Sequence, residues 1–252
     1  MSMELEFQDR VALVTGGASG IGKAVVVALA ARGARVGICD LNAAGAEAVA
    51  AEIGGGSLAV PMDVTDAAGV KAAVANAVES LGAPDILVNV AGWDQITRFL
   101  DTDEAFWDRV IAINFKGVLA TCHVVLPYMV ERGSGAVVNV ASEAGRAGSS
   151  GEVVYSGAKG AVIAFSKAVA REVARFGVRV NVVTPGLTDT PFLQRNVDEG
   201  HGKLMDAIVK ATPLQRMSTP EEVAEAILFL ASDRAAFTTG DTLSVSGGLV
   251  MM

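Results

Sequence analysis

Short apolar runs alternate along the chain with longer stretches in which apolar residues recur at helical spacing. The short runs are rich in Val, Ile and Leu, which is typical of strands buried on both faces. They predict strands at residues 10–16, 35–40, 58–64, 85–92, 136–142, 178–186 and 242–248. The longer stretches predict helices at residues 20–33, 43–53, 66–82, 103–132, 152–176 and 220–232.

This alternation of strand and helix predicts the fold class. Parallel strands joined by helical crossovers form a sheet covered by helices on both faces, so we expect a Rossmann-like, doubly wound α/β fold of about seven strands. No linker or repeat divides the chain, and residues 1–252 are expected to form one domain. Residues 187–217 depart from the alternation, and their apolar residues predict a short helical lid over a substrate pocket.

Composition argues against several classes of function. The net charge of −8 argues against nucleic-acid binding. Charged residues or glycines interrupt the apolar stretches before the ~18 residues that a membrane span needs, and residues 1–10 lack a signal-peptide pattern. Two cysteines, Cys39 and Cys122, and two isolated histidines predict a cytoplasmic protein without a disulfide framework or a metal site.

The first predicted strand runs into a glycine-rich segment, TGGASGIG, at residues 15–22. Gly16 would permit a tight turn, Gly20 would let a pyrophosphate approach the backbone, and Gly22 would let the next helix pack closely on the sheet. The unpaired N–H groups at the start of that helix would bind the phosphates. In this position between a strand and a helix, the segment predicts a dinucleotide site.

Two acidic residues follow the next two strands. Asp40 would accept hydrogen bonds from both hydroxyls of an adenosine ribose, and a helix N-cap is its alternative role. A 2′-phosphate would meet its charge at a cost on the order of 1 to 4 kcal/mol. Because the neighbours Leu41 and Ser19 are not basic, we expect NAD rather than NADP. Asp63 is expected either to bind the adenine amino group or to be a turn residue.

Tyr155 and Lys159 stand four residues apart in a helical stretch of small residues, so their side chains share one face. Taken alone, the pair fits better with a half-exposed helix whose tyrosine packs in the core and whose lysine is solvated. A catalytic role requires more, because a tyrosine with a pKa near ~10 is a weak base at neutral pH. Lowering that pKa by about 3 units requires roughly 4 kcal/mol, which a nearby ammonium in a site poor in water can supply.

The remaining motifs decide between these interpretations. TGGASGIG, NVAG at 89–92, Asn114, Ser142, YSGAK at 155–159 and PG at 185–186 occur in this order, and together they resemble the short-chain dehydrogenase/reductase family over essentially the whole chain. The resemblance implies that Tyr155 is the general acid/base, Lys159 its electrostatic partner, Ser142 the holder of the substrate oxygen and Asn114 the support of a proton-relay water. Val90 departs from the asparagine that the family usually has, which affects a supporting hydrogen bond rather than cofactor binding.

The resemblance implies contacts along the whole cofactor. They fall at Gly16, Ser19, Gly20, Ile21, Gly22, Asp40, Leu41, Asp63, Val64, Asn89, Ala91, Gly92, Tyr155, Lys159, Pro185, Gly186 and Thr188. It also implies a homotetramer, in which the helices at 103–132 and 152–176 pair across a two-fold axis and the last strand builds a second interface.

The substrate is expected to contact Trp93, Ser142, Glu143, Tyr155 and Phe192, with plain surface packing as the alternative for Trp93. Several segments resemble bacterial secondary alcohol dehydrogenases of cyclic and aromatic compound breakdown. This similarity implies an NAD-dependent enzyme that interconverts a secondary alcohol and its ketone, on a cyclic, aromatic or hydroxyacyl-CoA substrate. A CoA thioester would favour cations at the pocket mouth, such as those of Arg146, Arg195 and Lys203.

Three alternatives remain from the sequence. The first is a 1-arylethanol dehydrogenase, which would need none of those cations. The second is an NADPH-linked 3-oxoacyl-carrier-protein reductase, against which Asp40 argues. The third is a non-catalytic dinucleotide sensor, against which the presence of both Tyr155 and Lys159 argues.

Overall fold

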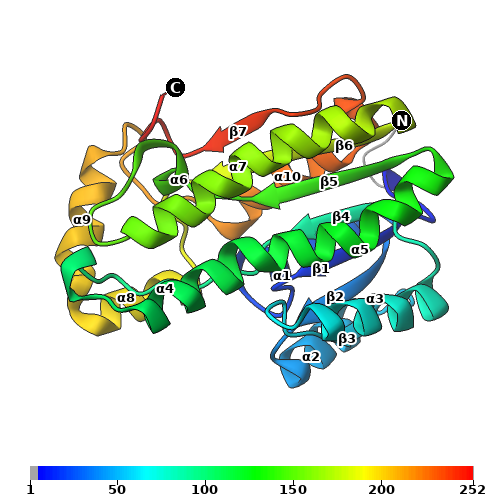
Figure 1. Ribbon diagram of the computed structural model, residues 1–252, viewed down its shortest axis with the longest axis horizontal. Coiled ribbons are helices and arrows are strands. Elements are labelled where there is room, and N and C mark those ends of the chain that lie inside the picture. The colour runs from blue at the N-terminus through cyan, green and yellow to red at the C-terminus, as the bar shows by residue number, and fades with distance from the viewer. Residues whose placement is uncertain (1–4, 252) are drawn as a thin grey trace.

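A single parallel sheet runs through the middle of the protein in the computed structural model, which describes residues 5–251 (Figure 1). Residues 1–4 and 252 of the predicted domain lie outside the described residues. The sheet has seven strands in the order β3-β2-β1-β4-β5-β6-β7. The strands are β1 Val11–Thr15, β2 Arg35–Asp40, β3 Leu58–Pro61, β4 Ile86–Asn89, β5 Gly135–Val140, β6 Val178–Pro185 and β7 Thr242–Val245. The predicted doubly wound α/β fold is therefore confirmed.

Helices cover both faces of this sheet (Figure 1). One layer is built from α1 Gly20–Ala31, α2 Ala43–Ile53 and α10 Pro220–Ala231, and the other from α3 Ala67–Leu81, α5 Gly117–Arg132 and α7 Val153–Val173. Strand β1 serves both layers, because Ala12 and Val14 pack into the first core and Leu13 into the second. Burial on both faces explains why the strands read as continuous apolar runs.

Polar residues set the starts of several helices. The side chains of Asn42, Asp66 and Asp103 accept hydrogen bonds from backbone N–H groups in the first turns of α2, α3 and α4 Glu104–Ile111. Thr219 and Glu222 form a reciprocal capping box at the start of α10. These local hydrogen bonds place the helix ends, and thereby the loops at both edges of the sheet.

The predicted helix at 103–132 is interrupted once. Ala112–Lys116 form a π-helical turn, η3, between α4 and α5. The side chain of Asn114 lies within this turn and donates to the Val110 carbonyl oxygen at 2.9 Å. A π-turn inserts an extra residue and re-aims the side chains that follow it, and such turns occur frequently at functional sites.

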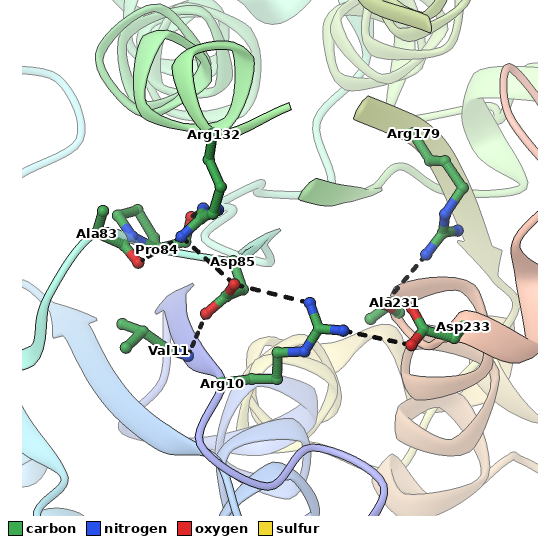
Figure 2. A network of polar contacts seen from close by, with 9 residues as sticks. All are labelled: Arg10, Val11, Ala83, Pro84, Asp85, Arg132, Arg179, Ala231 and Asp233. Carbon is green, nitrogen blue, oxygen red and sulfur yellow. Dashed lines mark hydrogen bonds and ion pairs between the residues drawn. The ribbon is translucent and has the colours of Figure 1, made fainter. Parts of the chain in front are cut away.

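Arginine and aspartate side chains join the elements at the amino edge of the sheet (Figure 2). Asp85 accepts from the Val11 N–H group at 2.8 Å and pairs with Arg10 and Arg132 at 3.7 and 3.4 Å. Arg179, on β6, donates to the last carbonyl groups of α10, including that of Ala231. This edge is occupied by scaffold contacts, and the opposite, carboxyl edge holds the cavity described next.

Two helical stretches are long and apolar enough, by length and composition, to cross a membrane: Glu104–Arg132 and Val153–Phe176. Within the described residues both lie against the same face of the sheet (Figure 1), and each most apolar window is only 39% and 28% buried, respectively. Both stretches therefore keep part of their apolar surface accessible in the single chain.

Candidate active site

A cavity of about 1310 Å³ lies at the carboxyl edge of the sheet. The strand arrowheads in Figure 1 point to this side, where α6 Ala144–Ala147, α8 Pro191–Asn196 and α9 Gly202–Ala211 lie. In a doubly wound fold, ligands bind at this edge, near the point where the strand order reverses. The predicted residues that line the cavity are Gly16, Ser19, Gly20, Ile21, Gly22, Asp40, Leu41, Asp63, Val64, Ala91, Gly92, Trp93, Ser142, Glu143, Tyr155, Lys159, Pro185, Gly186, Thr188 and Phe192.

The glycine-rich loop forms one end of the cavity. Gly16 and Gly20 have φ angles of +68° and +51°, a region that favours glycine. A Cβ on Gly22 would lie 2.0 Å from the Gly16 carbonyl oxygen, so the loop folds directly onto the start of α1. Ser19 is the N-cap of α1, and its side chain makes no capping hydrogen bond. The first amide groups of α1 can therefore bind an anion, which fits a pyrophosphate.

Asp40 lies beside this loop at the end of β2. Its carboxylate accepts from the N–H groups of Ala18 at 3.0 Å and Asn42 at 2.9 Å. The N-cap of α2 is Asn42, so the alternative role of Asp40 as a helix cap is wrong. Asp63 accepts from both the amide and the hydroxyl of Thr65, at 2.8 and 2.7 Å, and is a turn residue that also lines the cavity.

Tyr155, Lys159 and Ser142 meet in the middle of the cavity. Ser142 follows β5; its hydroxyl oxygen accepts from the Ala144 N–H group at 3.1 Å, and the hydroxyl lowers the pKa of Tyr155. Lys159 is 2% exposed, and its Nζ atom donates to the Val140 carbonyl oxygen at 3.0 Å. The same Nζ atom lies 5.6 Å from the centroid of the Tyr155 ring. The lysine is not solvated, which contradicts the interpretation of this helix as an ordinary half-exposed one.

The protein surroundings hold the tyrosine in its phenol form. Burial raises the pKa of Tyr155, the charges of Glu152 and Asp94 raise it further, and the hydrogen bond with Ser142 opposes them. Burial lowers the pKa of Lys159 to about 8. We expected the lysine charge to lower the tyrosine pKa; instead, burial and two acidic neighbours dominate in the protein alone. A protonated phenol is the form that can donate a proton to a ketone oxygen.

Two predicted residues, Asn89 and Asn114, do not line the cavity. The Asn89 side chain is buried, donates to the Asn139 side chain at 2.8 Å and accepts from the Thr121 hydroxyl at 2.8 Å. Asn114 is also buried, and it accepts from the Trp93 N–H group at 3.2 Å and donates to the Trp93 carbonyl oxygen at 2.6 Å. Both asparagines thus stabilise the loop behind the cavity wall, because their polar atoms are engaged there.

Val90 stands where the family usually has an asparagine, and main-chain hydrogen bonds hold the turn at this position. The Thr15 hydroxyl oxygen accepts from the N–H groups of Val90 and Ala91, at 3.1 and 3.2 Å. The following residue, Gly92, lies close to the side chains of Asn114 and Lys159. A Cβ on Gly92 would lie 3.0 Å from Asn114 Oδ1 and 3.5 Å from Lys159 Nζ. The turn is therefore held without the asparagine that the family usually has.

The segment at 187–217 folds into α8, a π-helical turn η5 at Val197–His201, and α9. Its apolar residues Phe192, Leu193, Leu204, Met205 and Ile208 all line the cavity. The cavity lining also includes Trp93, whose ring lies 3.9 Å from the Arg109 guanidinium and makes an edge contact with Phe106. Trp93 lines the cavity, so plain surface packing does not describe it. The substrate end of the cavity is mainly apolar.

The three cations that a CoA thioester would favour at the mouth do not line the cavity. Arg146 pairs with Glu143 at 3.4 Å, Arg195 lies over the Phe192 ring at 5.2 Å, and Lys203 is exposed. Sequence reasoning also missed Glu152, which lines the cavity. Its position as a lone acidic residue three residues before Tyr155 is the signal that would have found it.

Comparisons with known proteins agree with this geometry. Residues 16–250 match the profile of a family described as enoyl-(acyl carrier protein) reductase. A D-threitol dehydrogenase from Mycolicibacterium smegmatis is 41% identical, covering 98% of this chain and 96% of that protein. A 3-oxoacyl-[acyl-carrier-protein] reductase from Thermotoga maritima is 36% identical (98% and 100%), and a (3R)-3-hydroxyacyl-CoA dehydrogenase from Canis lupus familiaris is 35% identical (100% of each).

Solved structures share the whole fold. A Brucella melitensis structure described as a 3-oxoacyl-[acyl-carrier protein] reductase superposes with a TM-score of 0.91 at 33% identity, covering 99% of this chain and 94% of that one. Another from the same species, described as a ribose-5-phosphate isomerase, superposes with a TM-score of 0.93 at 36% identity, covering 98% and 94%. The curated relatives are dehydrogenases and reductases of alcohols and ketones. Together with the cavity and its ordered motifs, they establish that the chain is an oxidoreductase of the short-chain dehydrogenase/reductase family.

Proposed function

We propose that the protein is an NAD-dependent oxidoreductase that interconverts a secondary alcohol and its ketone, and that it works in the cytoplasm. The observation that carries this proposal is the meeting of Ser142, Tyr155 and Lys159 in the same cavity as the uncapped start of α1. A phosphate-binding helix end and a proton-transfer group in one cavity are the two parts that hydride transfer to a carbonyl needs. The two cysteines, Cys39 and Cys122, are free and buried, in keeping with a reducing compartment.

The cofactor would lie along the carboxyl edge of the sheet. The amides at the start of α1 would bind its pyrophosphate, Asp40 its adenosine ribose and Lys159 its nicotinamide ribose. When bound there, the nicotinamide supplies or accepts the hydride. Gly186 and Thr188 line the same cavity after β6 and would contact the carboxamide.

The protein's own groups handle the substrate oxygen and its proton. Ser142 would donate a hydrogen bond to the ketone oxygen and aim it at Tyr155. In the direction of reduction, the Tyr155 hydroxyl gives its proton to that oxygen as negative charge develops there. In oxidation, the same group takes the proton back, and the Lys159 ammonium stabilises the phenolate that results. The apolar wall keeps water from competing for this proton.

Asp40 supports NAD over NADP. Among the described residues that line the cavity, the cations are Arg109, which lies over the Trp93 ring, and Lys159, which donates to the Val140 carbonyl oxygen. A 2′-phosphate would therefore meet the carboxylate without a compensating cation. We expect kcat/KM with NADH to exceed that with NADPH by roughly tenfold or more. Asp40→Asn, which removes the charge and keeps the size, should reduce this preference, and a wild-type preference for NADPH would contradict the assignment.

The apolar wall supports a cyclic or aromatic substrate, or a hydroxyacyl-CoA. Trp93 and Phe192 both line the cavity, and an aromatic side chain can pack against a flat or cyclic group. The same surfaces suit a 1-arylethanol, which is the second candidate. The names of the relatives pair related chains with a sugar alcohol, an acyl-carrier-protein thioester and a CoA thioester, so a screen should include each kind of ketone.

Replacement of the proposed acid/base tests the chemistry. Tyr155→Phe removes only the hydroxyl, so we expect kcat to fall by about 10²–10⁴-fold while NADH still binds. Stopped-flow or steady-state NADH oxidation measures kcat, and NADH fluorescence titration measures the Kd for NADH. The matched control is Tyr128→Phe, at the other tyrosine of the chain, which lies on α5 and does not line the cavity. Full activity in Tyr155→Phe would refute the proposed role.

A further inference from the structure

Glu152 brings a carboxylate without a protein partner into the cavity of the proposed reaction. It is the residue just before α7, in the N-cap position, and its side chain makes no capping hydrogen bond. Within residues 5–251 its carboxylate takes part in no hydrogen bond or ion pair, and it lines the cavity together with Tyr155. A carboxylate accepts hydrogen bonds and donates none. A donor bound next to Tyr155 can therefore reach a carboxylate that no described protein group occupies.

Glu152 lies close enough to the tyrosine for its charge to act on the hydroxyl group. Glu152 directly precedes the first turn of α7, which holds Tyr155, and both residues line the same cavity. The charge of Glu152 raises the pKa of Tyr155, which agrees with this placement. A group bound by Glu152 would thus be attached to the substrate near the carbon whose oxygen faces Tyr155.

The cations around the cavity are engaged elsewhere. The Arg109 guanidinium lies over the Trp93 ring, and Lys159 Nζ donates to the Val140 carbonyl oxygen. Arg195 approaches the carbonyl oxygen of Asp94 at 3.5 Å. Asp94 itself is 2% exposed, and its Oδ2 atom has no hydrogen-bond partner. None of these cations forms a salt bridge with Glu152, and Asp94, which is also acidic, cannot neutralise its charge.

We propose that Glu152 is a specificity-determining residue that selects substrates with a hydroxyl group on the carbon next to the reacting one, that is, α-hydroxyketones and the vicinal diols formed from them. This inference rests on the proposed function, because it concerns the substrate of the same site. A hydroxyl donor gains a charge-assisted hydrogen bond to Glu152, whereas its absence leaves the carboxylate facing an apolar group. A neutral hydroxyl fits better than an ammonium, because Lys159 lines the same cavity and a bound oxidised nicotinamide would add a second positive charge there.

Matched ketones test this selection. Acetophenone, 2-hydroxyacetophenone, 2-methoxyacetophenone and 2-aminoacetophenone differ only at the carbon next to the carbonyl group, and the corresponding cyclohexanones form a second series. Initial rates of NADH oxidation give kcat/KM for each. We expect the hydroxyketone to exceed both the unsubstituted and the methoxy ketone by roughly tenfold or more, as a hydrogen bond to a charged group allows. A preference for the aminoketone would mean charge attraction instead and would overturn the proposal.

Variants at the position separate selection from folding. Glu152→Gln keeps a neutral acceptor and Glu152→Leu keeps none, so the ratio of kcat/KM for hydroxyketone over ketone should fall in the order Glu, Gln, Leu. A structural role alone would change both substrates together and leave this ratio unchanged. Removing the charge should also move the pH profile of alcohol oxidation to lower pH, because Glu152 raises the pKa of Tyr155. Glu79→Gln, on the exposed side of α3, is the matched control and should change neither.

Different results would contradict the selection by Glu152 and the proposed function. If the wild-type protein reduces acetophenone or cyclohexanone as well as their hydroxy derivatives, or if the ratio is the same in Glu152→Leu, the selection by Glu152 is wrong and the proposed function stands. If the protein binds NADH yet turns over no ketone of either series, the proposed function fails and the selection fails with it.

Discussion

At the scale of single residues, Asp94 is held in an unfavourable place for a charge. The side chain is buried, one carboxylate oxygen lacks a partner, and only the Gln95 amide and the charge of Arg195 favour ionisation. Burial raises the pKa of Asp94 from its ordinary 3.8 to about 7, and the charge of Glu152 contributes to the rise. The folded protein therefore binds a proton at Asp94 more tightly than the unfolded chain does.

This difference predicts a pH-dependent gain in stability for Asp94→Asn. The stabilising, protonated form of Asp94 is fully present below pH 4 and is lost as the pH rises through about 7. The neutral amide does not titrate, so the variant should match the wild type near pH 4 and exceed it at pH 8 by about 2–4 kcal/mol. Urea denaturation at both pH values measures the difference. Equal destabilisation of the variant at pH 4 and pH 8 would contradict a buried, titrating carboxyl group.

The sequence predicted the residues whose chemistry follows from type and spacing. Tyr155 and Lys159 share a helix face, and Gly16, Gly20 and Gly22 follow a strand, so their meeting at the carboxyl edge follows from the fold. The sequence did not show that the side chains of Asn89 and Asn114 would turn behind the cavity wall. That depends on partners far along the chain, such as Thr121 for Asn89 and Trp93 for Asn114.

The tyrosine environment was the least accessible to sequence reasoning. The spacing of Tyr155 and Lys159 suggested that a lysine charge would control the phenol. Two carboxyl groups from different segments, Asp94 and Glu152, together with burial, act more strongly on it in the protein alone. Glu152 stands near Tyr155 in the sequence, but the approach of Asp94 from a distant segment has no signal there.

At the scale of elements, the close contact between the glycine loop and α1 gives the next prediction. A Cβ on Gly22 would lie 2.0 Å from the Gly16 carbonyl oxygen and 2.7 Å from its carbon atom. Both are backbone atoms, so Gly22→Ala must displace the loop from the start of the helix. We expect a loss of about 1–3 kcal/mol in the free energy of unfolding and at least a roughly tenfold increase in the Kd for NADH.

A matched glycine separates this effect from that of the added methyl group itself. Gly202 begins α9 with a helical φ of −53°, and a Cβ there would meet only Val197, at 3.7 Å. Gly202→Ala should leave NADH binding unchanged and preserve or slightly raise the stability. Normal NADH binding by Gly22→Ala, measured by fluorescence titration, would be inconsistent with the loop as the phosphate site.

Comparison of the predicted and observed elements shows which of them the apolar pattern can predict. The seven strands and the helices of both layers were predicted because apolar runs and helical spacing are local signals. The π-helical turn at Ala112–Lys116 was not predicted, since the apolar pattern continues through it. The Asn114 side chain within it donates to the carbonyl oxygens of Val110 and Trp93. The second π-turn, at Val197–His201, was not predicted either, because its sequence offers only the glycine at 200, with a φ of +98°.

At the scale of the whole molecule, one chain leaves much apolar surface uncovered. The most apolar windows of the helices at Glu104–Arg132 and Val153–Phe176 are 39% and 28% buried. Phe237, just before β7, is fully exposed. Large exposed apolar areas mark contacts with other molecules. The resemblance to the family implies that both surfaces are covered by copies of the same chain, which remains a prediction.

We therefore expect a homotetramer with two kinds of interface, one along α5 and α7 and one beside β7. Light scattering after size exclusion should give about four times the 25.8 kDa mass of the chain. A glutamate at Phe237 would bury a charge without a partner in the second interface, so Phe237→Glu should yield dimers. Leu100→Glu, at an equally exposed apolar residue of the short helix Phe99–Asp101, lies outside both predicted interfaces and should leave the tetramer intact. A wild-type protein that elutes as a monomer at micromolar concentration would show that these apolar surfaces serve another partner.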